Sequence, residues 1–183
     1  MPAPLRRLAV AVVLCCALLA GTTGCGGDDK ADAAATTGAT PTATTSAEKQ
    51  KFAKTRFVAN AGLAAGATYQ WIVKPWKAGK FAKGADGRTA ALIKAGLAGA
   101  FAYNRLKAAA RNAQGDPTLA RAIAPLTAGI DALKDLPAKL RKGDTSAAGA
   151  FDDVIGKVKE AGRSAGAEVK DKVPSASELA AAS

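Results

Sequence analysis

Alanine is the feature that most narrows the folds open to this chain. It accounts for 47 of the 183 residues and glycine for another 19, whereas aromatic residues make up 5%. Alanine has the highest helix propensity of the amino acids, and the β-branched and aromatic residues that favour strands are scarce. The composition therefore predicts an all-α fold with a core of small side chains.

Two helices are predicted in the first half of the region after residue 45, where small and apolar residues recur at helical spacings of three and four. Thr45 and Glu48 have the form of a capping box at the start of the first helix. Lys74 precedes Pro75, which predicts that this helix ends there. The second helix is expected to begin near Gly87 and to end at Gly115, as a C′ glycine.

Two further helices are predicted between residues 116 and 173. Asp116 followed by proline is a strong start signal for the third. Pro125 should kink or split this helix, and Pro137 is expected to close it. A short turn leads to Gly143, predicted as a stop, and to Asp144, which caps the fourth helix, and that helix is expected to continue to Pro174.

Short connections between these helices indicate that sequential helices pack antiparallel. The sequence therefore predicts an Ala-rich antiparallel four-helix up-and-down bundle over residues 46–173, followed by a flexible tail at 174–183. Gly62 and Gly66 form a small-xxx-small motif within the first helix. We interpret it as close packing inside the bundle; a membrane-inserting hairpin is the alternative.

Several catalytic classes are excluded by composition. The chain contains no histidine, which removes the commonest general base and metal ligand. Its cysteines are Cys15, Cys16 and Cys25, all near the N-terminus. Asp152 and Asp153 are adjacent, so they point to different faces of a helix. We therefore expect no catalytic residue, no cofactor site and no metal site, and the protein is predicted not to be an enzyme.

The N-terminus has the parts of a bacterial export signal. Arg6 and Arg7 carry positive charge, an unbroken apolar run extends from Leu8 to Ala20, and small residues then precede Cys25. The run is shorter than the roughly 20 residues that span a bilayer, and it fits the apolar region of a secretory signal peptide.

This segment resembles the signal peptide of bacterial lipoprotein precursors, and the overall composition is similar to that of proteins from high-GC Gram-positive bacteria. The resemblance implies that residues 1–24 are removed and that Cys25 receives a diacylglyceryl group and fatty acyl chains such as palmitate. It places the protein on the extracytoplasmic face of the cell membrane. Plain secretion and an uncleaved membrane anchor are the alternatives.

The stretch that follows, 25–45, is predicted to be a disordered tether that starts at the lipidated cysteine. Residues 26–45 contain threonine, alanine, glycine and aspartate and no large apolar side chain. Such a composition cannot bury enough surface to offset the entropy of ordering. A tether of this length spans roughly 25 Å on average and reaches about 70 Å when extended.

Charge is distributed unevenly along the predicted bundle. Residues 48–111 carry a net charge of +11, whereas residues 112–183 are neutral. Lysines and aromatic residues alternate in the connector between the first two helices, and they attract anionic surfaces by charge and by the amphipathic indole ring. The candidate contacts with an anionic surface are Lys74, Trp76, Lys77, Lys80 and Lys83. In the alternative interpretation the loop is simply solvated, Trp71 belongs to the core and Phe81 caps the bundle end.

Together these patterns predict a non-catalytic binding or structural role at the cell envelope. The expected partners are the membrane, through the lipid anchor, and anionic lipid headgroups or cell-wall polyanions, through the lysine loop. A helical adaptor that binds another envelope protein and a carrier of small ligands remain as alternatives. Nucleic acid is not an expected partner because the chain is predicted to be exported.

Overall fold

A computed structural model describes residues 46–181, and within this range the protein is helical and contains no strand. The all-α prediction is confirmed. The predicted signal peptide, Cys25 and the tether lie outside the described residues. The helical elements are α2 (Ser46–Thr68), η1 (Tyr69–Val73), α3 (Lys74–Lys77), α4 (Arg88–Ala113), α5 (Pro117–Ile123), η2 (Ala124–Leu126), α6 (Thr127–Ala132), η3 (Leu133–Asp135), α7 (Leu136–Lys142), α8 (Ser146–Ser164) and α9 (Ala176–Ala181).

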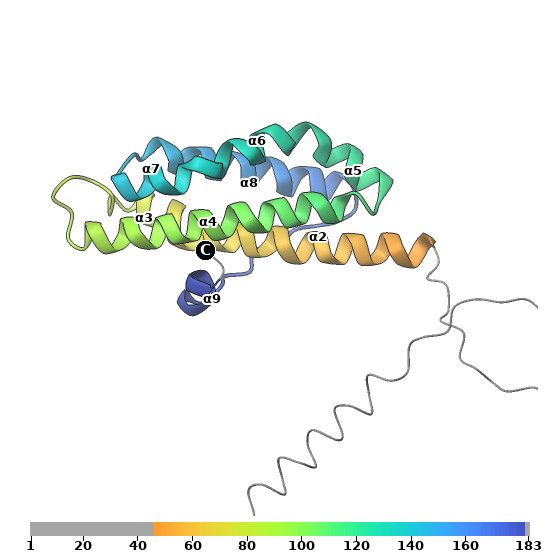
Figure 1. Ribbon diagram of the computed structural model, residues 1–183, viewed down its shortest axis with the longest axis horizontal. Coiled ribbons are helices and arrows are strands. Elements are labelled where there is room, and N and C mark those ends of the chain that lie inside the picture. The colour runs from red at the N-terminus through yellow and green to blue at the C-terminus, as the bar shows by residue number, and fades with distance from the viewer. Residues whose placement is uncertain (1–45, 182–183) are drawn as a thin grey trace, which may run out of the picture. The chain divides into compact units, whose positions relative to one another are not determined.

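The two longest helices, α2 and α4, lie side by side and form one layer (Figure 1). The segments α5, α6 and α7, together with α8, form a second layer that packs against this pair. The predicted four-helix up-and-down bundle is not confirmed in its simple form. Its third member is a series of short helical segments, and the C-terminus adds elements that the prediction lacks.

The core is built mainly from alanine side chains, with a few large apolar residues among them. Phe57, Phe101 and Phe151 are almost fully buried. The two long helices, α2 and α4, contact each other, and most of their buried residues are small. The buried alanines of these two helices are Ala53, Ala61, Ala64, Ala65, Ala67, Ala95, Ala98, Ala102, Ala109 and Ala113. The composition therefore anticipates the character of this core.

The first helix does not end at Lys74 as predicted. It continues through Pro75 to Lys77, and a π-helical turn at η1 precedes the proline. The Lys74 amide donates to the Tyr69 carbonyl. In a regular α-helix the proline ring clashes with the carbonyl four residues earlier. A π-turn adds one residue to the turn, and the proline then occupies the first turn of α3, where it is tolerated.

The third helix begins as predicted, because the Asp116 carboxylate accepts a hydrogen bond of 2.8 Å from the Leu119 amide. Pro125 splits the helix with a 3-10 turn, also as predicted. Pro137 does not close it. This proline lies in the first turn of α7, where its missing N–H would have no partner in any case, and the chain stays helical to Gly143. Gly143 has a φ of 88°, and this left-handed conformation ends the helix.

The fourth helix ends much earlier than the predicted Pro174. It stops at Ser164, and Gly166 follows with a φ of 68°. The Ala167 amide donates to the Gly162 carbonyl, which is the helix-ending pattern that a left-handed glycine permits. Residues 167–175, here called the strap, have no regular secondary structure.

The strap packs against α2 at two glycines of that helix, Gly62 and Gly66. The Lys172 amide donates a 2.9 Å hydrogen bond to the carbonyl of Gly62. A Cβ atom at Gly62 would lie 2.5 Å from the Lys170 carbonyl oxygen, and one at Gly66 would overlap the Lys172 carbonyl. The small-xxx-small motif therefore serves close packing as predicted, but its partner is extended backbone rather than another helix.

The segment predicted to be a flexible tail contains the short helix α9, which contacts α4. Its Leu179 side chain is 3% exposed. Ser175 and Glu178 form a reciprocal capping box: the Glu178 carboxylate accepts from the Ser175 amide at 2.7 Å, and the Glu178 amide donates to the Ser175 hydroxyl at 3.2 Å. The sequence signal for this helix is the Ser-x-x-Glu spacing.

No helix between Ser46 and Ala181 is both long enough and apolar enough to cross a bilayer.

Candidate functional site

The lysine-bearing connector between α3 and α4 is an ordered series of turns. Gly79 has a φ of 70° and ends α3. The Gly79 amide donates to the Trp76 carbonyl at 2.9 Å, and the Lys80 amide donates to the Pro75 carbonyl at 3.0 Å, which together form a Schellman motif. Two later glycines of the connector, Gly84 and Gly87, also have positive φ.

Phe81 attaches this connector to the end of the helical layers. Its side chain is 2% exposed and belongs to the main apolar cluster. The Arg88 side chain donates a 3.0 Å hydrogen bond to the Phe81 carbonyl. The position of Phe81 agrees with the interpretation that it caps the bundle end. The neighbouring lysines are therefore held on a defined backbone.

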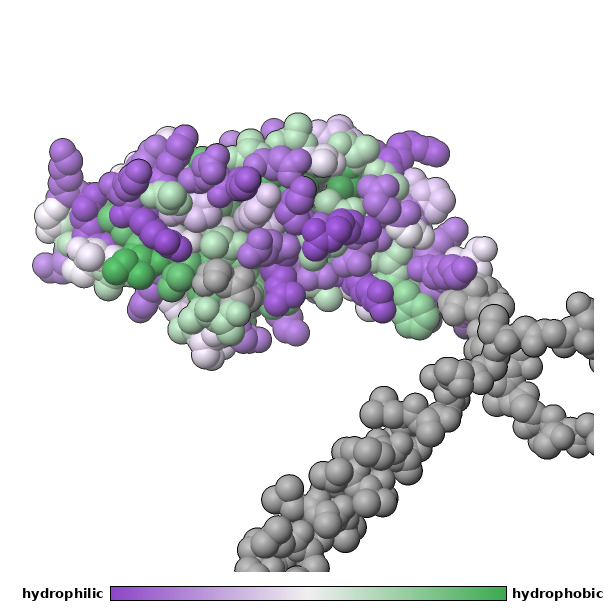
Figure 2. Space-filling view, in the orientation of Figure 1, coloured by the Kyte–Doolittle hydropathy of each residue, from purple (hydrophilic) through white to green (hydrophobic). Residues whose placement is uncertain are grey.

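A groove of about 390 Å³ lies between the η1–α3 segment and the first turns of α4. Three lysines, Lys74, Lys80 and Lys94, line it, and no acidic residue is among its lining residues. On the face shown in Figure 2, an apolar patch flanked by hydrophilic side chains lies at this end of the molecule. The groove is lined by Gln70, Trp71, Lys74, Pro75, Ala78, Lys80, Gly87, Ala90, Ala91 and Lys94.

Trp71 forms part of the groove wall and is half-buried. The Lys94 ammonium lies 5.7 Å from the centroid of its indole ring, within the range of a cation–π contact. The Trp71 Nε1 atom is buried and has no hydrogen-bond partner among the described residues. Trp71 thus belongs both to the core, as the alternative interpretation proposed, and to the wall of the groove.

The structure brings together only part of the predicted contact set. Lys74 and Lys80 line the groove. Trp76 instead packs against the core beside α8. The Lys77 ammonium lies 3.8 Å from a carboxylate oxygen of Asp152 on α8. Lys83 is exposed in the connector and is not among the lining residues. The fold therefore separates five residues that are neighbours in sequence onto different sides of the helix end.

Sequence reasoning missed Lys94 as a member of this site. It lies on α4, eleven residues beyond Lys83, the last lysine of the connector. A signal for it exists, because Gly87, Ala90, Ala91 and Lys94 follow each other at spacings of three, one and three. This spacing puts them on one face of a helix. The face could be recognised from sequence, but not that it meets the π-turn of the first helix.

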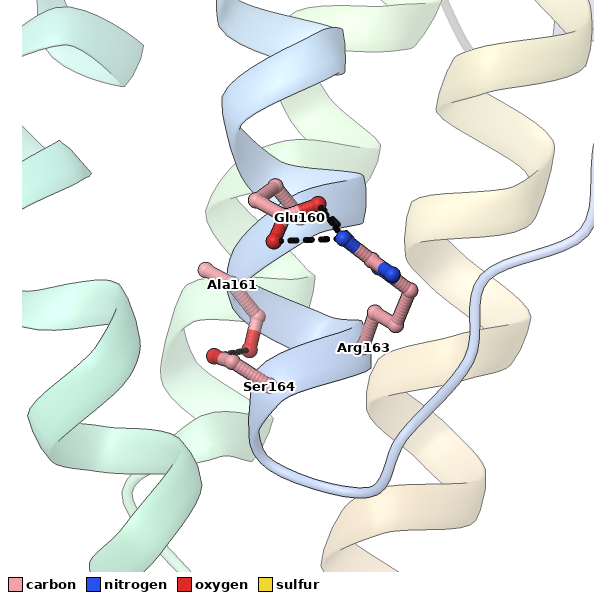
Figure 3. A network of polar contacts seen from close by, with 4 residues as sticks. All are labelled: Glu160, Ala161, Arg163 and Ser164. Carbon is pink, nitrogen blue, oxygen red and sulfur yellow. Dashed lines mark hydrogen bonds and ion pairs between the residues drawn. The ribbon is translucent and has the colours of Figure 1, made fainter.

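A second hollow, of about 450 Å³, lies between the end of α2, α8 and the strap. Its charged residues are largely paired with one another. Lys159 contacts Asp171 at 2.8 Å, and Arg163 binds Glu160 at 2.7 Å (Figure 3). The Glu160 carboxylate raises the pKa of Arg163 above its usual value. The carboxylates of Glu160 and Asp171 are therefore partners in ion pairs at the surface of this hollow.

No cluster of three or more metal-ligating side chains occurs in residues 46–181. The lysine groove is therefore the clearest candidate site in the described part of the chain. Comparison of the chain with models of known protein families, with curated proteins and with solved structures reveals no match.

Proposed function

We propose that this chain is an exported lipoprotein that holds a non-catalytic binding domain at the outer face of the cell membrane, with Cys25 as the lipid-bearing residue. The observation that carries the binding role is the lysine groove. Lys74, Lys80 and Lys94 surround one hollow that has no acidic lining residue. Clustered ammonium groups attract anions, and we infer a ligand that carries phosphate groups.

The groove has the chemistry for such a ligand. Each lysine ammonium offers three hydrogen-bond donors and no acceptor. Trp71, Pro75 and three alanines supply an apolar surface for the uncharged part of the ligand. Its volume of about 390 Å³ lies within the usual range for small-ligand sites. An anionic lipid headgroup and a phosphate-linked polymer of the cell wall share this chemistry.

Binding of the full chain to poly(glycerol phosphate), and separately to phosphatidylglycerol vesicles, tests the proposal and distinguishes the two sources. Tryptophan fluorescence reports binding because Trp71 lines the groove. Replacing both Lys80 and Lys94 with glutamine should weaken binding about thirtyfold, on the basis of about 1 kcal/mol for each lysine. High salt should weaken it as well.

Lys83→Gln is the matched control. It removes the same charge from the same connector but lies outside the groove lining, so its effect should be several times smaller than that of Lys80→Gln. Equal effects of these two substitutions would mean that charge alone matters and that the groove is not the site. If neither the lysine substitutions nor high salt changes the affinity, the proposal is wrong, and an apolar surface that binds another protein would replace it.

The anchor is tested separately by the intact mass of the protein taken from its native membrane. The expected mass is that of residues 25–183 plus a diacylglyceryl group, with or without a further acyl chain. In the same host, Cys25→Ala should release the protein into the medium. Retention of this variant in the membrane would indicate an uncleaved apolar anchor instead.

A further inference from the structure

A second basic hollow lies at the opposite end of the first helix, where the described chain begins. It has a volume of about 360 Å³ and lies between the first turns of α2 and the end of α4. Three of its lining residues are cations, and none is acidic. The hollow is lined by Lys49, Phe52, Ala53, Arg56, Arg111, Asn112 and Gly115. We call Lys49, Phe52, Arg56 and Arg111 the end patch.

Phe52 distinguishes this patch from an ordinary charged surface. Its side chain is 58% exposed, whereas Phe57, little more than one turn further along α2, is fully buried. Lys49 and Arg56 lie three residues before and four residues after Phe52, so all three share one helix face. An exposed aromatic ring among cations on one face of a helix is the pattern of an interfacial membrane contact.

The patch is built on two helices that are held close together. A Cβ atom at Gly115 would lie 2.8 Å from the Cβ of Ala53, so the turn after α4 packs tightly on α2 here. Asp116, the acid next to this turn, is buried and lies 3.7 Å from the Lys54 ammonium. Glu48 lies on the same helix face, four residues before Phe52, but the three cations outnumber this acid, so the end patch presents a net positive charge on a fixed surface.

The exposed aromatic ring and the cations favour a lipid bilayer as the occupant, and the position of the end patch in the chain agrees with it. Lys49 follows Ser46, the first residue of α2, and only twenty residues separate Ser46 from Cys25. The lysine groove lies at the other end of the continuous helical run from Ser46 to Lys77, which is about 45 Å long at roughly 1.5 Å per residue. The tether from Cys25 would therefore join the helical region at the end patch, about 45 Å of helix before the groove.

We infer that the end patch lies on the anionic surface of the lipid bilayer, with the Phe52 ring in the headgroup region. Each basic residue near such a surface strengthens binding about fivefold, and the end patch supplies the second signal that a lipid anchor needs for stable attachment. The lysine groove then faces away from the membrane, towards the wall. The orientation rests on the proposed anchor, whereas the lipid contact does not.

Amine labelling of the full chain in reconstituted vesicles tests this inference. A water-soluble amine reagent, followed by mass spectrometry, reports the exposure of each lysine. With phosphatidylglycerol in the vesicles, labelling of Lys49 should fall at least about fivefold relative to pure phosphatidylcholine vesicles. Labelling of Lys80 and Lys83 should not change. High salt should restore much of the Lys49 reactivity.

Two variants make the result specific. Phe52→Ser combined with Arg56→Gln should remove the protection of Lys49. Ile93→Ser is the matched control, because Ile93 is exposed to a similar extent, 52%, but lies on α4 near the lysine groove. Protection that survives the double variant would overturn the inference. So would protection of Lys80 and Lys83 instead of Lys49, which would mean that the groove end meets the lipid.

The same variants separate this inference from the proposed function. Phe52→Ser with Arg56→Gln should leave the binding of poly(glycerol phosphate) to the lysine groove unchanged. If the unsubstituted chain does not bind the polymer while its Lys49 is protected in vesicles, the groove proposal fails and the end patch stands. If the unsubstituted chain binds the polymer and its Lys49 shows no protection, the end patch fails alone.

Discussion

Two glycine pairs are buried on the two long helices but are covered differently. Gly62 and Gly66 on α2 lie beneath the backbone of the strap, at the carbonyls of Lys170 and Lys172. On α4, Gly96 is covered by the side chain of Arg141, and Gly99 by side chains from the second layer. Both pairs look alike in sequence, as small residues at helical spacing.

The difference shows what a small-residue motif can and cannot indicate. A carbonyl group of the backbone cannot move aside without moving the chain, whereas the exposed side chain of Arg141, whose Cγ is the atom nearest to Gly96, can swing away by changing its χ1 rotamer. Glycine is therefore sterically required at positions 62 and 66, whereas a larger residue can be accommodated at position 96. Three substitutions test this contrast, and an acid titration then tests the helix that follows the strap, in order of decreasing expected effect.

The largest effect is expected from the ring that covers the α4 pair. Phe151 is fully buried, and its ring atoms lie 3.2 Å from the position of a Cβ at Gly99. Phe151→Ala should lower the free energy of unfolding by about 4 kcal/mol, because it removes buried apolar surface and leaves a cavity. Urea denaturation measures this loss, and a loss below about 1 kcal/mol would show that the layer collapses onto the gap.

Gly66→Ala tests the backbone cover of the α2 pair. The added methyl group would overlap the Lys172 carbonyl, and overpacking of this kind costs about 1–3 kcal/mol. We expect a net loss of about 2 kcal/mol in stability, even though alanine has the higher helix propensity. Hydrogen exchange should also show that the Lys172 amide loses its protection. A stabilised variant with a protected Lys172 amide would contradict the steric requirement.

Gly96→Ala is the matched substitution on α4 and should be nearly neutral. The added methyl group meets the side chain of Arg141, which can move. A gain in helix propensity of up to about 1 kcal/mol offsets that rearrangement. Denaturation should therefore place this variant within about 1 kcal/mol of the parent protein. A loss as large as that of Gly66→Ala would erase the distinction between the two pairs.

The smallest effect concerns acid loosening of the short helix that follows the strap. Hydrogen bonds from the Ser175 amide and hydroxyl lower the pKa of Glu178 below its usual value. The cap therefore contributes stability above the unfolded-state pKa of about 4.3, and this contribution is lost as the pH falls through the folded-state pKa. An NMR titration should show the Leu179 methyl signals change in this range before those of Leu106.

Glu178→Gln is the control for the acid effect, because it cannot ionise but keeps a similar shape. The Leu179 signals of this variant should no longer depend on the protonation of residue 178. If they still shift in the acidic range, another carboxyl group governs the attachment of α9.

Local chemistry allowed a good part of the fold to be predicted from sequence. The all-α class follows from the alanine content. The start at Asp116, the split at Pro125 and the stop at Gly143 follow from caps, missing amides and a left-handed glycine. Each of these signals acts within one helical turn. Their effect therefore does not depend on which other segment packs against them.

The predictions that failed concern features that depend on how distant segments of the chain pack together. Pro75 and Pro137 were expected to end helices, but a π-turn and a new first turn accommodate them. The predicted fourth helix is longer than α8, because the helical spacing of apolar residues continues to Val169. This residue is buried, but it lies in the strap and not in a helix. Burial produces the same pattern in both settings, so spacing alone could not separate them.

The candidate site was predicted only in part for the same reason. Lys74 and Lys80 were predicted from the charge-rich connector, but the third lysine of the groove, Lys94, belongs to the next helix. Trp76 and Lys77 lie beside α8 instead. Which lysines share a groove depends on the pitch of the π-turn and on the direction in which α4 departs.

The sequence by itself determined the helical class, the small-residue core, several helix caps and the excess of positive charge in the first half. The tertiary structure decided what covers each glycine pair, where the strap lies and which cations share a surface. The physical reason is the range of the interactions. Propensity, capping and net charge are properties of short segments, whereas covering a glycine or assembling a groove requires contacts between segments far apart in the chain.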